Sequence, residues 1–195
     1  MKRLVLMGGR PWLAADGGAA CAAALFRYAG KSPKLAFCIF AQPESDWHAT
    51  EQANTAILNA NSGGRHVTYR TMTPQNVTEV SNWADIIYVP GGNSHVLKEK
   101  LASIPGLAAL WDGKLVAGSS AGAVTLCERY IYLQDKTFGQ GLGWVKASCI
   151  PHWRDAFETY TDDDWDWAEE QMTSRYPDLP VLCIPEGKYV EITIP

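Results

Sequence analysis

Residues 114–123 read KLVAGSSAGA, and this stretch decides the fold. The apolar run Leu115–Ala117 is followed by the pattern Gly-x-Ser-x-Gly and then by a helix-compatible run. Small residues at positions 118, 121 and 122 let a strand and a helix approach closely across a sharp turn. The central residue of such a turn, Ser120, is held in a strained backbone that raises its hydroxyl above the sheet. We therefore predict a nucleophile elbow, in preference to a plain turn in which Ser120 only caps a helix.

Strand-like and helix-like segments alternate on both sides of this turn. The central strands are continuous apolar runs, which is typical of strands buried on both faces of a mostly parallel sheet. We therefore predict an α/β fold, a three-layer sandwich with helices on both faces of a mostly parallel sheet. The predicted strands are Arg3–Met7, Leu35–Phe40, His66–Arg70, Asp85–Val89, Leu115–Ala117, Lys146–Ile150, Val181–Ile184 and Tyr189–Ile194. The predicted helices are Gly18–Tyr28, Ser45–Ala60, Val77–Trp83, Ser94–Ala102, Ala121–Cys127 and Asp162–Tyr176.

Composition limits the class of protein. The chain has 195 residues, 47% of them hydrophobic, which suits one domain over residues 1–195 and excludes disorder. Its 17 Lys and Arg against 21 Asp and Glu leave no basic excess for phosphates, so we expect no nucleic-acid partner. No apolar run approaches the roughly 20 residues that a bilayer requires, so we expect no membrane partner. The five Cys form no CxxC pair and lie mostly in apolar segments, which favours a cytoplasmic protein.

A second strand end carries paired glycines. The predicted strand Asp85–Val89 leads into Pro90 and then Gly91, Gly92 and Asn93. Glycines at such a position let backbone N–H groups approach a ligand closely. With the N–H of Ala121, that of Gly92 would give the two donors that an oxyanion requires. Taken alone, the same residues also form an ordinary turn.

A third strand end carries a histidine. His152 follows the predicted strand Lys146–Ile150 and a proline, which is a rigid position for a general base. Such a histidine needs a carboxylate to orient it, and both Glu186 and Asp135 are candidates. We favour Glu186 because it follows an apolar strand, as His152 does. No metal-ligand spacing is visible, so we expect neither a metal nor a cofactor.

Together these segments resemble the peptidase E family of serine peptidases, which includes aspartyl dipeptidases and, more distantly, cyanophycinases. The resemblance implies a class I glutamine amidotransferase-like, flavodoxin-like fold. It also implies Ser120 as nucleophile, His152 as base, and the amides of Gly92 and Ala121 as oxyanion donors. Glu186 falls on the family's Pro-Glu-Gly position, and Asp135 falls on an aspartate that has also been proposed for the charge relay.

Two features depart from the family pattern. Its aspartyl dipeptidases are expected to bind the substrate's Asp with an Arg located between the His and Pro-Glu-Gly motifs, where this chain has TDDDWDW at 161–167. This acidic stretch would repel a substrate carboxylate unless Arg154 or Arg175 supplies the charge. The same residues also suit the acidic first turn of a helix. The sequence stops soon after Tyr189–Ile194, so we expect it to lack part of the family's C-terminal region.

We therefore predict a serine exopeptidase of the dipeptidase type that hydrolyses short peptides through a Ser120 acyl-enzyme, with His152 as general base. We expect a monomer or homodimer, and its specificity for Asp is open. One alternative is a catalytically silent binding or regulatory member of the same fold, and another is a serine esterase or amidase. A glutaminase-type amidotransferase ranks lower because that chemistry uses a Cys at the elbow.

Overall fold

The computed structural model describes residues 2–155 and 159–194. Its strands are β1 (Lys2–Met7), β2 (Lys34–Phe37), β3 (Thr68–Thr71), β4 (Ile86–Val89), β5 (Leu115–Ser119), β6 (Cys127–Tyr132), β7 (Thr137–Gln140), β8 (Val145–Pro151), β9 (Val181–Ile184) and β10 (Tyr189–Ile194). Its α-helices are α1 (Ala19–Phe26), α2 (Trp47–Ala60), α3 (Val77–Trp83), α4 (Ser94–Ala102), α5 (Leu107–Leu110), α6 (Ala121–Leu126) and α7 (Asp162–Arg175). Two 3-10 turns are η1 (Pro11–Leu13) and η2 (Glu44–Asp46).

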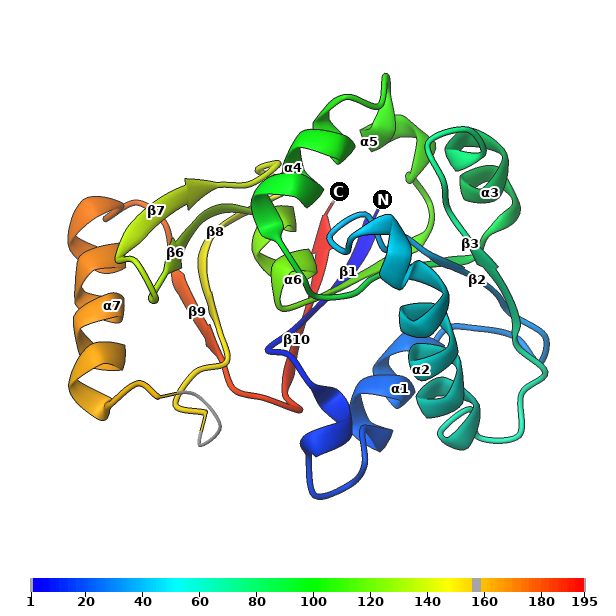
Figure 1. Cartoon of the computed structure of the whole chain (residues 1–195), viewed down its shortest axis with the longest axis horizontal. Coiled ribbons are helices and arrows are strands. Elements are labelled where there is room, and N and C mark those ends of the chain that lie inside the picture. The colour runs from blue at the N-terminus through cyan, green and yellow to red at the C-terminus, as the bar shows by residue number, and fades with distance from the viewer. Residues whose placement is uncertain (1, 156–158, 195) are drawn as a thin grey trace.

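A six-stranded sheet forms the right-hand part of the molecule in Figure 1, in the order β10-β1-β5-β4-β2-β3. Its strands pair in parallel, except that β10 runs antiparallel to β1. Helices cover both faces. Leu4 and Leu6 of β1 pack in one core with α3, α4, α5 and α6, whereas Val5 and Met7 pack in another with α1 and α2. The sides alternate because successive side chains of a strand point to opposite faces. This is the predicted three-layer, mostly parallel arrangement.

A second, four-stranded sheet has the order β7-β6-β8-β9 and corrects the prediction of a single sheet. The sequence analysis predicts no strand between residues 127 and 145, where β6 and β7 form a hairpin. It misses β6 because α6 passes directly into that strand at Cys127, so the apolar run reads as one helix. Helix α7 covers one face of this sheet, where Ile131 and Ile150 pack against Trp165 and Met172.

The short helix α6 is buried throughout and contributes to the core that the two sheets share. A Cβ added to Gly118 would lie 2.4 Å from the carbonyl carbon of Gly122. A Cβ added to Gly122 would lie 2.1 Å from the carbonyl oxygen of Val89. Backbone atoms cannot accept such contacts, so α6 reaches β4 and β5 only because both positions are glycine. This close approach sets the sharp turn between β5 and α6.

The remaining predicted elements are found, several with shifted ends. The bounds of α3, α4, β9 and β10 are as predicted. Strand β2 ends at Phe37, because the chain turns soon afterwards, where the N–H of Gln42 donates to the carbonyl of Ile39. Strand β3 begins at Thr68 rather than His66. None of the helices in the described residues is long and apolar enough to cross a membrane.

The packing of α6 predicts the effect of a single methyl group. We expect Gly118→Ala to lower the free energy of unfolding by about 1–3 kcal/mol or more, because the added Cβ overpacks the α6–β5 contact. Urea denaturation measures this change. Gly30→Ala is the control, since its Cβ would meet no described atom within 4 Å, and we expect a change below about 0.5 kcal/mol. Equal stability of the two variants would contradict this account.

Candidate active site

Ser120 alone makes the turn between β5 and α6. Its φ of 52° and ψ of −111° are a conformation that residues other than glycine rarely adopt. Its N–H donates to the carbonyl of Met7 at 3.0 Å, and its Oγ lies 2.7 Å from Nε2 of His152. Among the described residues, the hydroxyl makes no capping bond to α6. The backbone at Ser120 thus has the sharp geometry of an elbow, with its hydroxyl directed at an imidazole.

His152 follows the last residue of β8 and also has a positive φ, of 55°. Its Nδ1 lies 2.8 Å from Oε1 of Glu186, while its Nε2 faces Ser120. Glu186 comes two residues after β9, and β8 and β9 are parallel neighbours whose ends, Pro151 and Ile184, pair in register. Adjacent parallel strands therefore bring the histidine and the glutamate to the same edge of the four-stranded sheet.

Asp135, the rival carboxylate, lies elsewhere. It is exposed in the turn between β6 and β7, and its Oδ1 accepts hydrogen bonds from the N–H and the hydroxyl of Thr137. The structure therefore brings Ser120, His152 and Glu186 into one hydrogen-bonded chain and places Asp135 in a hairpin turn.

The end of β1 and the loop that follows it join all three of these segments. The carbonyl oxygens of residues 7, 8 and 9 accept, in that order, hydrogen bonds from the N–H groups of Ser120 (3.0 Å), His152 (2.9 Å) and Gly187 (3.2 Å). Ser120 follows a strand of the six-stranded sheet, whereas the other two follow strands of the four-stranded sheet. Because each bond fixes a backbone segment, the loop sets how the nucleophile, the imidazole and the glutamate lie relative to one another.

Only glycine fits at two positions of this loop. A Cβ on Gly9 would lie 2.2 Å from Cε1 of the His152 ring, and one on Gly8 would lie 2.1 Å from the carbonyl oxygen of Pro185. This loop was not predicted from the sequence. The available signal was a glycine pair directly after a buried strand, which is the same pattern that pointed to Gly91 and Gly92.

Arg10 ends the loop and pairs with two carboxylates. Its Nε lies 3.3 Å from Oε1 of Glu186, and its Nη1 lies 3.8 Å from Oδ2 of Asp155. The side chain of Asp155 is 3% exposed and that of Glu186 is 9% exposed. One guanidinium thus offsets part of the repulsion between two buried carboxylates. Neither Arg10 nor Asp155 was predicted as a site residue, because no local pattern in the sequence indicates that they meet.

These contacts shift the pKa of Glu186 in opposite directions. Burial raises the pKa of its carboxyl group, and the neighbouring carboxyl of Asp155 raises this pKa further. The hydrogen bond from His152 and the charge of Arg10 act in the opposite direction, and the pKa remains above its ordinary value of 4.5.

The same carboxylates could in principle hold a metal. Among the described residues, His152, Asp155 and Glu186 form one cluster whose ligand atoms lie within 4.8 Å of one another. The guanidinium of Arg10 lies against both carboxylates, and its positive charge opposes a cation there. The cluster therefore suits the orientation of an imidazole better than the binding of a metal ion.

The loop after β4 passes beside Ser120. A Cβ built on Gly91 would lie 3.6 Å from Oγ of Ser120. The side chain of Gln42 fixes this peptide, because its Nε2 donates to the carbonyl of Gly91 at 2.7 Å. In a trans peptide the C=O and the following N–H point in opposite directions, so the N–H of Gly92 is turned away from Gln42. Gln42 was not predicted as a site residue, because it lies far from this loop in the sequence.

Ala121 and Asn93 are the two remaining predicted site residues, and they have different contacts. Ala121 is buried at the start of α6 and borders a cavity next to Ser120. Asn93 caps α4, since its Oδ1 accepts the N–H of Val96 at 3.1 Å. Its side-chain oxygen therefore already serves the helix.

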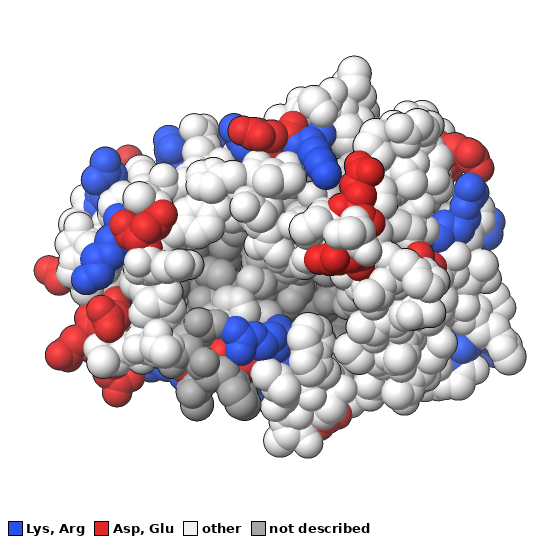
Figure 2. Space-filling model, in the orientation of Figure 1, with Lys and Arg blue, Asp and Glu red and all other residues white. Residues whose placement is uncertain are grey.

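Two cavities meet at the nucleophile. The larger has a volume of about 810 Å³ and lies towards η1 and α2, and the smaller, of about 340 Å³, lies towards β6 and β8. Gly92, Ser120 and His152 border both. Figure 2 shows this face hollowed near its centre, with walls drawn mostly in the colour of residues that are neither acidic nor basic. A ligand chain could thus extend to either side of the Ser120 hydroxyl.

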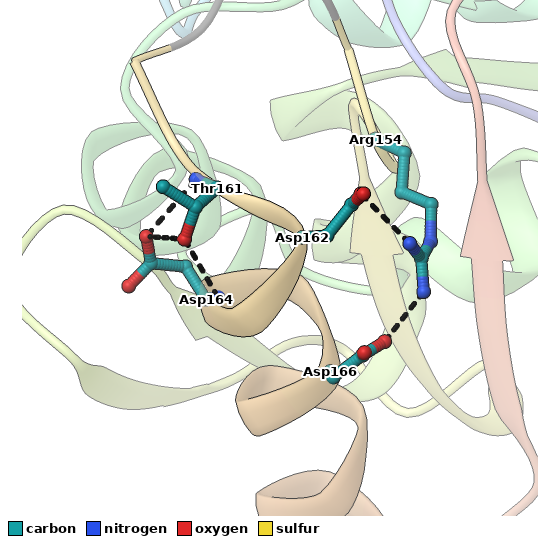
Figure 3. Close-up of polar contacts among 5 residues, drawn as sticks. All are labelled: Arg154, Thr161, Asp162, Asp164 and Asp166. Carbon is teal, nitrogen blue, oxygen red and sulfur yellow. Dashed lines mark hydrogen bonds and ion pairs between the residues drawn. The ribbon is translucent and has the colours of Figure 1, made fainter.

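The acidic residues after Thr161 begin α7. The side chains of Thr161 and Asp164 form a reciprocal capping box with each other's backbone N–H groups (Figure 3). Arg154 donates to both Asp162 and Asp166 from outside the helix (Figure 3). The stretch is thus an acidic helix start, which was the second interpretation of the sequence, and Arg154 binds the chain's own carboxylates.

The raised pKa of Glu186 predicts a pH-dependent stability. Between 4.5 and the raised value, the folded protein binds more protons at Glu186 than the unfolded chain, so the free energy of unfolding falls as pH rises through this window. We expect Glu186→Gln to remove this contribution, so that the variant gains stability relative to the parent protein as pH rises. Urea denaturation at several pH values measures the difference. Asp135→Asn is the exposed control, and a difference for Glu186→Gln that is independent of pH would contradict the expectation.

Comparisons with known proteins agree with this fold. A crystal structure of a peptidase from an acI-B1 Actinobacterium has 22% sequence identity and a TM-score of 0.63, over 85% of this chain and 74% of that one. A crystal structure from Listeria monocytogenes EGD-e, provisionally assigned to peptidase E, has 18% identity and a TM-score of 0.66 over 100% of both chains. A search of curated proteins finds no significant match. The model of peptidase family S51 matches residues 4–193, and the chain therefore belongs to this family of serine peptidases, the peptidase E family.

Proposed function

We propose that the chain is a serine exopeptidase that hydrolyses short peptides, with Ser120 as nucleophile, His152 as general base and Glu186 as the orienting carboxylate. The observation that carries this proposal is the continuous chain of hydrogen bonds from Oγ of Ser120 through the imidazole to Glu186, with distances of 2.7 and 2.8 Å. These are the distances and roles that nucleophilic catalysis by a serine requires. Membership of a serine dipeptidase family supports short peptides as the substrates.

The chemistry proceeds through an acyl-enzyme. Nε2 of His152 takes the proton of Ser120 as Oγ attacks the scissile carbonyl carbon, and the imidazolium then gives this proton to the leaving amine as the C–N bond breaks. A water molecule, deprotonated by the same nitrogen, attacks the ester, and the proton returns to Oγ as the acid leaves. Glu186 accepts the hydrogen bond of the Nδ1–H throughout and stabilises the imidazolium.

The developing oxyanion needs donors that are already in place. We assign these to the N–H groups of Gly92 and Ala121. Two observations support the assignment: the Gly91 loop lies against Ser120, and Gln42 holds the carbonyl of Gly91, which keeps this peptide from flipping. Asn93 contributes by capping α4 and so fixing the loop.

The compartment and the oligomeric state of the protein are also proposals. All five cysteines are free thiols and four of them are buried, which supports the cytoplasm as the compartment. We propose a monomer or a homodimer.

Esters and amides would pass through the same acyl-enzyme, so relative rates on matched peptide and ester substrates separate a peptidase from an esterase.

Replacing the nucleophile tests the mechanism. We expect Ser120→Ala to lower kcat for dipeptide hydrolysis on the order of 10⁴-fold or more, because no acyl-enzyme can form. Circular dichroism and thermal denaturation should show an intact fold, since the side chain lost is small. A fluorophosphonate probe should label the parent protein at Ser120, as mass spectrometry of the peptides would show. Substantial peptide hydrolysis by the folded variant would refute the mechanism, and failure to label would favour a catalytically silent protein.

The two carboxylates give a second test. We expect Glu186→Gln to lower kcat by roughly 10²- to 10⁴-fold with a smaller change in KM, because the amide neither fixes the tautomer of His152 nor stabilises its charged form. Asp135→Asn should hydrolyse dipeptides at nearly the parent rate. The opposite ranking of the two variants would assign the orienting role to Asp135.

A further inference from the structure

We infer that one of the two peptide residues flanking the scissile bond carries a bulky, uncharged apolar side chain, which lies in the 810 Å³ cavity between η1 and α2. The inference rests on the proposed function, because it names the substrates of the same nucleophile. It departs from the preference for an acidic residue that the resemblance to aspartyl dipeptidases suggests. Three observations support it: the walls of the cavity, the partners of its one cation, and the positions of the other candidate arginines.

The walls of the cavity offer apolar surface next to the nucleophile. Ala53 and Ile57 contribute from α2, one turn apart, and Trp12 contributes from η1. Tyr88 and Pro90 line the cavity at the end of β4, next to Ser119 and Ser120. Trp12 is 47% exposed, which is unusual for so large an apolar side chain, and a bound apolar group would cover part of it.

Only one Lys, Arg, Asp or Glu is among the described residues that line this cavity, and it is Arg10. Its guanidinium already faces Glu186 and Asp155. A substrate carboxylate would have to compete with these two groups for the same cation, and it would be repelled by both of them. Drawing Arg10 away would also leave two buried carboxylates without their cation, which is costly. The cavity therefore disfavours an acidic side chain.

The other candidate cations have partners elsewhere in the described chain. Arg154 binds Asp162 and Asp166 at the start of α7 (Figure 3), and the guanidinium of Arg175 lies 4.5 Å from the centre of the Phe138 ring. Neither lines the larger or the smaller cavity as described.

The smaller cavity, unlike the larger one, has no Lys, Arg, Asp or Glu among its described lining residues. It is bordered instead by apolar and aromatic side chains that include Ile131, Leu133, Ile150 and Trp165. Among the described residues, Arg10 is thus the one Lys, Arg, Asp or Glu that lines either cavity.

The test begins with dipeptides in which one residue is varied at a time. The series comprises Ala-Ala, Leu-Ala, Phe-Ala, Asp-Ala and Lys-Ala, with the corresponding peptides that vary the second residue. On at least one side, we expect kcat/KM for Leu or Phe to exceed that for Ala by about 10- to 200-fold, the range for filling an apolar pocket. Asp and Lys on that side should be no better than Ala. A preference for Asp on either side, or equal rates for all five residues on both sides, would overturn the inference.

A pair of variants on α2 ties this preference to the cavity. Ala53→Phe fills the cavity from its wall, so the ratio of kcat/KM for the preferred Phe or Leu peptide to that for Ala-Ala should fall about 10-fold or more. Ala56→Phe is the matched control, because Ala56 is exposed on the same helix and is not among the residues that line the cavity. It should leave the ratio unchanged. A fall of the ratio in both variants or in neither would overturn the placement in this cavity.

Labelling of Ser120 by a fluorophosphonate probe separates this inference from the proposed function. If Ser120 is labelled and peptides are hydrolysed but without the apolar preference, only the inference is wrong. If Ser120 is not labelled and none of the peptides is hydrolysed, the proposed function fails, and the inference fails with it.

Discussion

The carbonyl oxygens of residues 7–9 impose the constraint on which the rest of the site depends. Ser120 follows a strand of one sheet, and His152 and Glu186 follow strands of the other, so strand pairing within a sheet does not fix the distance from the serine to the other two. Backbone hydrogen bonds from the end of β1 and the loop that follows it to all three segments fix this distance. Glycine at positions 8 and 9 is what lets the imidazole and the loop after β9 come this close.

Strained backbone conformations occur in this loop and at the residues that it contacts. Arg10, Ser120 and His152 are three of the five non-glycine residues with positive φ in the described chain, and each conformation costs about 1–3 kcal/mol. Such conformations persist only where the surroundings over-determine them. Here the buried helix α6 and its close packing hold Ser120, the strand pair β8–β9 holds His152, and the carboxylates of Asp155 and Glu186 hold Arg10. Each strained conformation is thus held by a different part of the fold.

The parts of this arrangement that the sequence predicts are those with local signals. The elbow at Ser120 shows in the spacing of small residues, and His152 and Glu186 each follow an apolar run. The sequence could not decide between Glu186 and Asp135, because the choice depends on β9 lying beside β8. No pattern in the sequence indicates that Arg10 pairs with Asp155, because this pairing depends on contacts across the fold. The β6–β7 hairpin was not predicted from the sequence, because β6 follows helix α6 without a break.

The pairing of β1 with β10 has a consequence for synthesis of the chain. These are the first and last strands described, and the loop that carries Glu186 is anchored to residues 8 and 9 as β10 pairs with β1. A nascent chain on the ribosome, with Ile184 already outside the exit tunnel but β10 still inside, carries its serine and its histidine without the glutamate in position. The chain of hydrogen bonds from Ser120 to Glu186 is therefore complete only when the last strand described has joined the sheet.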